Sequence, residues 1–280
     1  MSKNVKDSFV VLSDFHAYEY PLDKVKDYYL NEYENVFILG DATDRGKDFQ
    51  GSNGIYILLE IKKLTEMYPN RVHYIPGNHD QFLYEYGVLN SKVARLLLLE
   101  NGGEKTMREL NGLMEDDRDE LLNWLGKQPL QMTHEFCGQK YAFAHAFFDM
   151  ELYKENPNLS LNDALKSDNI RRRVKEILWF RKEKDEYISS KVPSKDYIEV
   201  IGHTPYETRW NISLDLKNAD GDTVKVVCVD GGIAYGDKML KYDGGYGARV
   251  TLDIEHKDTS PKEEENIIIP NKRHEVNKRI

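Results

Sequence analysis

The sequence predicts an α/β (α+β) fold with a functional site at one edge of its sheet. Over residues 8–80, short apolar segments alternate with longer segments that carry apolar residues at helical spacing, as in βαβ units. Each apolar segment stops abruptly at Asp, His or Asn. Because the carboxyl ends of parallel strands meet at one edge of a sheet, we expect these polar side chains to lie close together.

The elements of residues 8–80 can be assigned from composition and spacing. The apolar runs predict strands at residues 8–13, 36–39 and 72–75, and the intervening segments predict helices at 22–34 and 53–68. In the second helix, five aliphatic residues form a wide apolar face: Ile55, Leu58, Leu59, Ile61 and Leu64.

The remainder divides into helical and strand-rich parts. Residues 81–128 read as helical, with segments at 81–86, 91–99 and 116–127, and residues 150–195 read as a second helical insertion. Both insertions are expected to border the cleft and to set substrate choice. Further strands are expected at 130–136, 140–144, 197–201, 208–214, 224–229 and 248–254, with tight turns at 137–139, 218–221 and 243–245. We therefore expect one domain over residues 1–256 and a charged tail over 257–280.

The overall composition restricts the classes of partner that the protein is expected to bind. The 280 residues are 40% hydrophobic and 31% charged, as in ordinary globular proteins, and carry a formal net charge of −9. This charge argues against stable binding to nucleic acid or to an anionic membrane. The two cysteines form no CxxC motif, the start lacks an apolar signal sequence, and no apolar run reaches the ~20 residues that span a bilayer. A cytoplasmic location is expected, while the oligomeric state is left open.

Metal-binding side chains follow the predicted strands. Six of them suit two divalent ions, with Mn²⁺ the first expectation and Fe²⁺, Zn²⁺ or Ni²⁺ as alternatives: Asp14, His16, Asp41, Asn78, His145 and His203. The spacing of Asp14 and His16 is expected to turn both to one side of a strand. Asp41 could bridge the ions with its two oxygens. Two such ions, ~3.5–4 Å apart, activate a bridging water and hold phosphoryl oxygens.

Four more residues suit phosphate-ester hydrolysis. His79 could donate a proton to the leaving oxygen, and Asp44 could orient His79 and keep it protonated near neutrality. Arg45 and Arg181 could hold the non-bridging phosphate oxygens. Each motif alone has an ordinary explanation, such as a turn, a core histidine or a solvated helix residue. The joint, ordered occurrence of the motifs favours a two-metal site. We interpret the other histidines as structural: His73, His134, His256 and His274.

The motif order resembles the calcineurin-like metallophosphoesterase superfamily, and within it the phosphoprotein phosphatase family. The family motifs GDxHG, GDxVDRG, GNHE, a later metal histidine and a GHT histidine correspond to residues 13–17, 40–46, 77–80, His145 and 202–205. The resemblance covers residues 8–252. It is greatest to phage-lambda-type bacterial Ser/Thr protein phosphatases, through Trp179-Phe180-Arg181 and Gly202-His203-Thr204-Pro205.

The resemblance implies a two-sheet sandwich flanked by helices. It implies one metal on Asp14, His16 and Asp41, and a second on Asp41, Asn78, His145 and His203. It also implies His79 with Asp44 as the acid pair, and Arg45 with Arg181 on phosphate. The chain departs from the family pattern at five positions: Ser13, Ala17, Thr43, Asp80 and Ala146.

Three functions compete. The first is a metal-dependent phosphomonoesterase similar to Ser/Thr protein phosphatases, in which a hydroxide bridging two metal ions attacks phosphorus directly. Its substrate would be a phosphorylated protein or a small phosphoester. The second is a symmetrical dinucleoside tetraphosphate hydrolase, which Gly77-Asn78-His79-Asp80 and residues 120–130 also resemble. The third, a non-catalytic metal-binding scaffold, is disfavoured because all six ligands are present.

Overall fold

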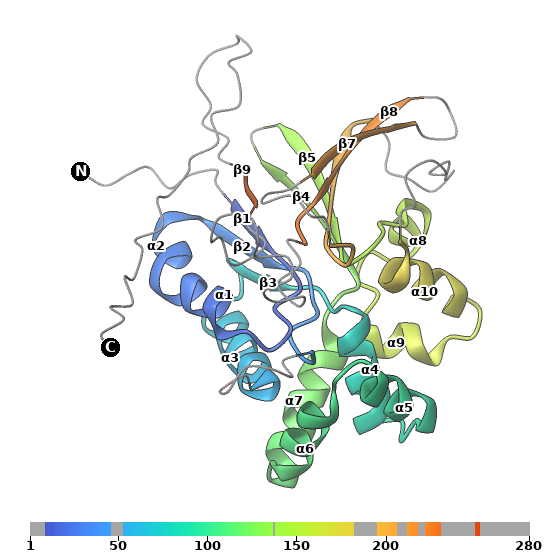
Figure 1. Ribbon diagram of the computed structural model, residues 1–280. Coiled ribbons are helices and arrows are strands. Elements are labelled where there is room, and N and C mark those ends of the chain that lie inside the picture. The colour runs from blue at the N-terminus through green and yellow to red at the C-terminus, as the bar shows by residue number, and fades with distance from the viewer. Residues whose placement is uncertain are drawn as a thin grey trace, which may run out of the picture.

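Two β-sheets pack face to face, with helices outside them (Figure 1). The computed structural model describes residues 9–45, 53–136, 138–181, 195–205, 212–217, 222–230 and 250–252. The predicted α/β fold with two sheets is confirmed. The tail over 257–280 and the turn at 243–245 lie outside the described residues, as do His256 and His274.

The first sheet has the strand order β3-β2-β1-β9. Its first three strands are parallel, and the last lies antiparallel beside β1: β1 (Phe9–Leu12), β2 (Asn35–Ile38), β3 (Val72–Tyr74) and β9 (Val250–Leu252). Every residue of β1 and β2 is buried, as expected of strands that are covered on both faces. The predicted strands are present here, and the described ends differ by one or two residues.

The second sheet has the order β4-β5-β6-β8-β7, with three parallel strands in its centre and an antiparallel strand at each edge. Its strands are β4 (Gln131–Phe136), β5 (Gln139–Ala144), β6 (Tyr197–Ile201), β7 (Ile212–Lys217) and β8 (Thr223–Cys228). The predicted strand at 208–214 ends too early. It continues to Lys217, because the antiparallel pairing with β8 continues to Lys217 opposite Thr223.

Aromatic side chains join the two sheets. The rings of Phe37 (β2) and Phe143 (β5) are stacked with centroids 4.2 Å apart, and those of Phe9 (β1) and Phe136 (β4) are stacked at 4.3 Å. All four are buried. Large aromatic rings bury much apolar area, so these pairs fix the separation and register of the sheets. The edges that carry the ligand loops are thereby held together.

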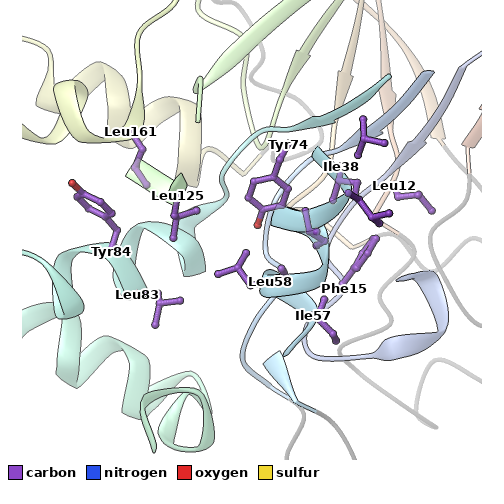
Figure 2. Close-up of a cluster of buried hydrophobic side chains, with 14 of the residues drawn as sticks. Leu12, Phe15, Ile38, Ile57, Leu58, Tyr74, Leu83, Tyr84, Leu125 and Leu161 are labelled. Carbon is purple, nitrogen blue, oxygen red and sulfur yellow. The ribbon is translucent and has the colours of Figure 1, made fainter. Parts of the chain in front are cut away.

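Helices cover the outer face of the first sheet. They are α1 (Glu19–Lys24), a π-helical segment (Val25–Tyr29), α2 (Leu30–Glu32) and α3 (Gly54–Met67). The predicted helix at 22–34 therefore begins earlier and contains a π-helical segment. Asn53 ends the preceding loop and caps α3, because its side-chain oxygen accepts the Tyr56 N–H at 2.8 Å. Figure 2 shows Leu58 of α3 beside Tyr74 of β3 in this apolar layer.

The two predicted helical insertions are also helical in the structure. The first comprises α4 (Asn78–Gly87), α5 (Lys92–Glu100), α6 (Glu104–Gly112) and α7 (Glu115–Lys127), and the second comprises α8 (Met150–Glu155), α9 (Leu161–Lys166) and α10 (Arg171–Trp179). Residues 182–194 lie outside the described part. Among the described residues, no helix is both long enough and apolar enough to cross a membrane.

Two features of the first insertion differ from the prediction. The helix predicted from residue 81 begins at Asn78, because Asp80 caps α4 by accepting the Gly77 N–H at 2.8 Å. The helix α6 was not predicted. It has nine residues and only three buried side chains, of which just Met107 and Leu110 are apolar, and glycines stand at both of its ends, so little apolar sequence marks it.

We expect Phe37→Ala to lower the free energy of unfolding by about 3–5 kcal/mol, because it removes a fully buried ring from between the sheets. Denaturant unfolding followed by circular dichroism measures this. Leu96→Ala is the control, since Leu96 is 57% exposed on a helix and should change stability little. Equal effects of the two substitutions would contradict the assignment of this core.

We expect stability to fall as the pH drops from about 6.5 to 4, with His73 as a contributor. Burial, helped by the nearby His134, lowers the pKa of His73 from 6.5 to about 4. The unfolded chain therefore takes up a proton in this window before the folded chain does. One pKa unit corresponds to about 1.4 kcal/mol, and partial exposure of the ring reduces the effect.

His73→Phe removes this proton while keeping a ring against Phe37, whose centroid lies 4.7 Å from that of His73. Unfolding measured at several pH values should show a smaller loss of stability on acidification in the variant than in the wild type. Parallel pH curves for the two proteins would contradict the assignment to His73.

Candidate metal centre

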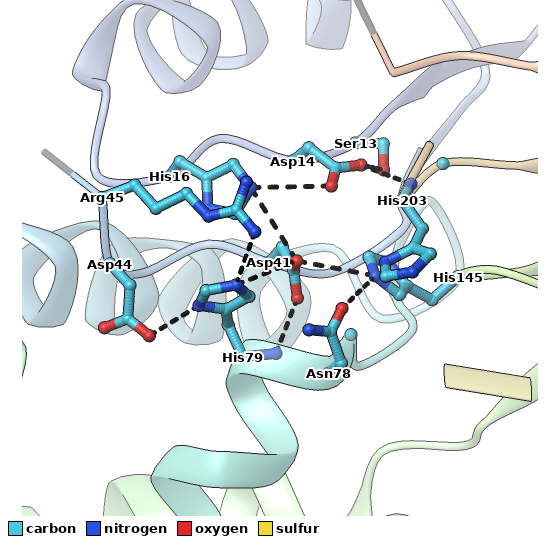
Figure 3. A network of polar contacts seen from close by, with 12 residues as sticks. Ser13, Asp14, His16, Asp41, Asp44, Arg45, Asn78, His79, His145 and His203 are labelled. Atoms are coloured by element: carbon cyan, nitrogen blue, oxygen red, sulfur yellow. Dashed lines mark hydrogen bonds and ion pairs between the residues drawn. The ribbon is translucent and has the colours of Figure 1, made fainter. Parts of the chain in front are cut away.

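The six predicted ligands lie just beyond the carboxyl ends of five strands, five of them in loops and Asn78 at the start of α4, and the fold brings them together (Figure 3). Asp14 and His16 follow β1, Asp41 follows β2, Asn78 follows β3, His145 follows β5 and His203 follows β6. All six are buried. Two sheets thus contribute to one cluster, as expected of a site at the carboxyl edge of parallel strands.

The backbone of these loops is unusual. Asp14, His16, Asp41 and His203 have φ angles of 56°, 45°, 53° and 64°, in the left-handed region that side chains other than Gly rarely adopt. Such strain persists only where the surroundings impose it, and it concentrates at functional sites. Here, the Asp14 N–H donates to the Gly40 carbonyl at 3.0 Å and the His16 N–H donates to the Asp41 carbonyl at 2.9 Å. Backbone bonding between the two loops therefore holds the strained residues.

This geometry corrects one prediction. We expected Asp14 and His16 to share a side through strand alternation, but β1 ends at Leu12. The two side chains still converge, since Asp14 Oδ1 lies 3.7 Å from His16 Nε2. The left-handed turn brings them together.

Asp41 lies at the middle of the cluster. Its Oδ2 is 3.6 Å from His145 Nε2, 3.8 Å from His16 Nε2 and 4.0 Å from His79 Nε2. Its Oδ1 accepts the His79 N–H at 2.9 Å. Asp41 belongs to two groups of ligand atoms that lie within 4.8 Å of one another, one with His16 and His79 and one with His145 and His203. A carboxylate shared in this way suits a pair of cations.

Two imidazoles are oriented by backbone carbonyls. His145 Nδ1 lies 2.7 Å from the Leu39 carbonyl, and His16 Nδ1 lies 3.2 Å from the Thr43 carbonyl. An Nδ1–H that donates to a carbonyl leaves the Nε2 lone pair for a metal, which is the usual arrangement around metal-binding histidines. Both Nε2 atoms face Asp41.

Two further observations fit bound cations. Asn78 Oδ1 lies 3.0 Å from His145 Nε2, and two acceptors at this distance repel each other unless a proton or a cation lies between them. His203 Nε2 is buried and has no hydrogen-bond partner among the described atoms. The donor set of imidazole nitrogens with carboxylate and amide oxygens suits borderline divalent ions.

The cluster electrostatics support this interpretation. Burial, together with the neighbouring His145, lowers the pKa of His203 from 6.5 to about 2, so its ring is neutral near pH 7. For His145, burial opposes protonation, but the Asp41 and Asp14 carboxylates outweigh it and raise its pKa. Burial also opposes ionisation of Asp14, yet His16, His145 and the Ser13 hydroxyl hold the pKa of Asp14 below 3.8. The site therefore concentrates anionic charge that cations can neutralise.

The contacts of His79 differ from those of the other imidazoles. By distance alone, His79 belongs to one candidate metal group with His16 and Asp41. The family resemblance implies Asp14 as the third ligand of that metal instead. However, Asp44 Oδ2 lies 2.8 Å from His79 Nδ1, and Arg45 Nη2 lies 3.2 Å from His79 Nε2 (Figure 3). A guanidinium beside Nε2 competes with a cation for that position. The contacts suit an Asp44–His79 proton-transfer pair better than a metal ligand.

The second predicted phosphate-binding residue, Arg181, is exposed just after α10. Its positive charge contributes to lowering the pKa of His203. Arg173 anchors α10, with two hydrogen bonds of 2.7 Å to the buried Asp149 carboxylate. Trp179, at the end of α10, donates its indole N–H to Gln81 Oε1 at 3.0 Å. The helix that precedes Arg181 is thus fixed on both sides.

Sequence reasoning missed three supporting residues. The Ser13 hydroxyl donates to Asp14 Oδ2 and lies 3.2 Å from the Leu39 carbonyl oxygen. The His203 N–H donates to the same Asp14 oxygen, so Asp14 Oδ1 is left to face His16. Asp80 Oδ2 accepts from the Asp41 N–H, the Gly77 N–H and the Tyr74 hydroxyl at 2.7–2.9 Å. The sequence feature that could have identified Ser13 and Asp80 is that both depart from the family pattern. Cys228, whose thiol lies 3.3 Å from the Thr204 carbonyl, gave no signal.

Comparison with known proteins agrees with this chemistry. Residues 8–228 match the family model described as calcineurin-like phosphoesterase. A symmetrical bis(5'-nucleosyl)-tetraphosphatase of Erwinia tasmaniensis is 31% identical over 134 residues, which cover 47% of this chain and 40% of that protein. The asymmetrical bis(5'-nucleosyl)-tetraphosphatase PrpE of Halalkalibacterium halodurans is 29% identical over 143 residues, which cover 50% of this chain and 52% of that protein. The chain thus spans about half the length, or less, of these curated relatives.

Solved structures that this chain matches include a putative diadenosine tetraphosphatase, with 13% identity, a TM-score of 0.47 and coverage of 89% of this chain and 96% of that one. A cold-active protein-tyrosine phosphatase of Shewanella has 17% identity, a TM-score of 0.48 and coverage of 84% and 77%, respectively.

We expect Asp41→Asn to weaken Mn²⁺ binding more than about 100-fold, since even residues that only orient metal ligands contribute about 10–100-fold. Calorimetric titration of metal-free protein, with elemental analysis after dialysis against Mn²⁺, measures this. Asp23→Asn makes the same chemical change on an exposed part of α1 and should bind as the wild type does. Unchanged Mn²⁺ binding by the Asp41 variant would place the metal elsewhere.

Proposed function

Because the chain belongs to the calcineurin-like phosphoesterase family, we propose that it is a metal-dependent phosphoesterase that hydrolyses dinucleoside tetraphosphates. The observation that carries the phosphoesterase assignment is the shared Asp41 carboxylate between two groups of imidazoles. Mn²⁺ is the first metal to test, because carboxylate and amide oxygens stand beside the nitrogens.

The substrate is proposed from the relatives. The two proteins above are named bis(5'-nucleosyl)-tetraphosphatases, and they include one symmetrical and one asymmetrical enzyme. The segment at 120–130 that resembles the symmetrical enzymes does not itself favour a nucleotide. In α7, Leu121 and Leu125 are buried in the core, and the Trp124 ring is stacked on Tyr74 at 5.4 Å. The side chains of this segment stabilise the fold. The proposed substrate therefore rests on the overall sequence similarity to the tetraphosphatases and not on this segment.

The residues suggest how hydrolysis would proceed. The six ligands would hold two divalent ions, and these would supply activation of water and screening of the phosphate charge. Arg45 would pair with a non-bridging phosphate oxygen and so leave His79 Nε2. Asp44 holds the opposite ring nitrogen, so the Nε2–H would point at the leaving oxygen. Arg181 would add a second cation at the rim.

One observation favours a second candidate, a phosphomonoesterase acting on phosphoserine or phosphothreonine. The Asp44–His79 pair is fully buried and hydrogen-bonded. A serine or threonine alkoxide is a poor leaving group that needs a proton, whereas a phosphate leaving group, with a pKa of about 6, departs readily without one. An intact proton donor is therefore more useful for a phosphoprotein substrate than for a tetraphosphate.

We expect the wild type with Mn²⁺ to convert diadenosine tetraphosphate to adenine nucleotides, separated by ion-exchange chromatography. Two molecules of ADP would indicate symmetrical cleavage, and ATP with AMP would indicate asymmetrical cleavage. Asp41→Asn should abolish the reaction, while Asp23→Asn should not. Unchanged tetraphosphate, with rapid phosphate release from a phosphoserine peptide, would reject the first proposal in favour of the second. Hydrolysis of neither substrate would favour a non-catalytic scaffold.

His79→Asn separates the two candidates further. Loss of a general acid costs about 10²–10⁴-fold when the leaving group needs a proton. We therefore expect a loss of this size with the phosphoserine peptide and a much smaller one with the tetraphosphate, measured as kcat at saturating Mn²⁺. Equal losses would contradict a role for His79 as proton donor.

A further inference from the structure

The turn between α5 and α6 packs directly against Asp44. A Cβ added to Gly103 would lie 2.8 Å from Asp44 Oδ1, and 3.0 Å from both the Leu98 carbonyl oxygen and Leu98 Cδ2. The backbone at Gly103 is ordinary, with φ −81° and ψ 11°, so any residue could adopt it. What requires glycine here is the close approach of the Asp44 carboxylate.

Asp44 is poorly held on the side that faces Gly103. Its Oδ2 contacts His79 Nδ1, while its Oδ1 is buried without a hydrogen-bond partner among the described atoms. Its backbone has a strained φ of 71°. Because no group in the described part of the chain restrains Oδ1 by a hydrogen bond, the carboxylate orientation depends on what packs against that oxygen. The first turn of α6, whose N–H groups lack intrahelical acceptors, begins just after Gly103 and favours a negative charge nearby.

The turn cannot easily move away. The Gly103 N–H donates to the Leu98 carbonyl at 2.6 Å, and the Gly103 carbonyl accepts the Met107 N–H at 2.9 Å. Further along α6, Glu109 Oε2 accepts the Ile55 N–H at 3.3 Å, which ties α6 to the start of α3. A side chain at residue 103 would therefore push Asp44 rather than the helix.

We propose that Gly103 is a positioning residue for the acid pair. Its missing side chain lets α6 pack against Asp44 Oδ1, so that Oδ2 stays on His79 Nδ1. The helical insertion thereby takes part in proton donation. This inference rests on the proposed phosphoesterase function, with His79 as the proton donor.

The test compares Gly103→Ala with Gly112→Ala. Gly112 ends the same helix, and a Cβ there would meet nothing within 4 Å, so the second variant is a matched control. Turnover is measured at saturating Mn²⁺ with phenyl phosphate, whose leaving group needs a proton, and with 2,4-dinitrophenyl phosphate, whose leaving group does not. We expect Gly103→Ala to slow phenyl phosphate by about tenfold and dinitrophenyl phosphate by less than about twofold. Gly112→Ala should change neither rate.

A change that merely loosens the fold would slow both esters alike, and that result would overturn the inference. Asp44→Ala separates this failure from a failure of the proposed mechanism. If Asp44→Ala slows phenyl phosphate selectively and Gly103→Ala does not, only the role of Gly103 is wrong. If Asp44→Ala shows no selectivity between the esters, the acid pair is wrong and the inference falls with it.

Thermal unfolding of the double variant gives a readout independent of activity. If the added methyl group acts through Asp44, the fall in Tm caused by Gly103→Ala should be smaller when Asp44→Ala is also present. A Gly103→Ala chain that folds only in the Asp44→Ala background supports the inference. The same fall in Tm in both backgrounds, or failure to fold in both, would overturn it.

Discussion

The arrangement of the whole site depends on one buried carboxylate. Asp41 Oδ2 faces three imidazole nitrogens at 3.6–4.0 Å, and Asp41 Oδ1 is fixed by the His79 N–H. An unpaired carboxylate in such a setting would be costly, since burial penalises charge. Cations bound between Asp41 and the imidazoles would remove that cost. The same residue therefore explains why the loops from both sheets converge and why the site suits phosphate chemistry.

The position of Asp41 depends on hydrogen bonds made by Asp80, which lies at the start of α4. Asp80 accepts the Asp41 N–H at 2.9 Å and also the Tyr74 hydroxyl, and the Tyr74 ring is stacked on Trp124 of α7. Burial raises the pKa of Asp80, against the opposing hydrogen bonds from Gly77, Tyr74 and Asp41. The strained loop after β2 is thus connected through Asp80 to the aromatic core of the helical insertion. The insertion thereby contributes to the geometry of the candidate metal centre.

The site also combines features suited to different leaving groups. The metal ligands would serve any phosphate ester or anhydride, because they act on the phosphoryl group itself. The proposed Asp44–His79 acid pair would act on the leaving group alone. Substrate class is therefore a question about the surroundings of the metal centre. The similarity to tetraphosphatases favours the first proposed substrate, a dinucleoside tetraphosphate. The buried acid pair favours the second, a phosphoserine or phosphothreonine.

The sequence by itself determined the fold class and the six candidate ligands. Short apolar runs that alternate with helically spaced apolar residues are typical of α/β proteins, and each ligand follows closely after an apolar run. It could not identify α6, because a nine-residue helix with three buried side chains owes its stability to packing against α3 and the Asp44 loop.

Only the tertiary structure decided how the ligands converge and what holds them. Asp14 and His16 meet through left-handed backbone conformations that local propensity disfavours, and bonds to the loop after β2, which is distant in sequence, stabilise them. The Leu39 carbonyl orients His145 from more than a hundred residues away in the chain. Ser13 and Gly103 are unremarkable as letters in a sequence. They matter because the fold places a carboxylate oxygen against each of them, and such contacts are not encoded in local pattern.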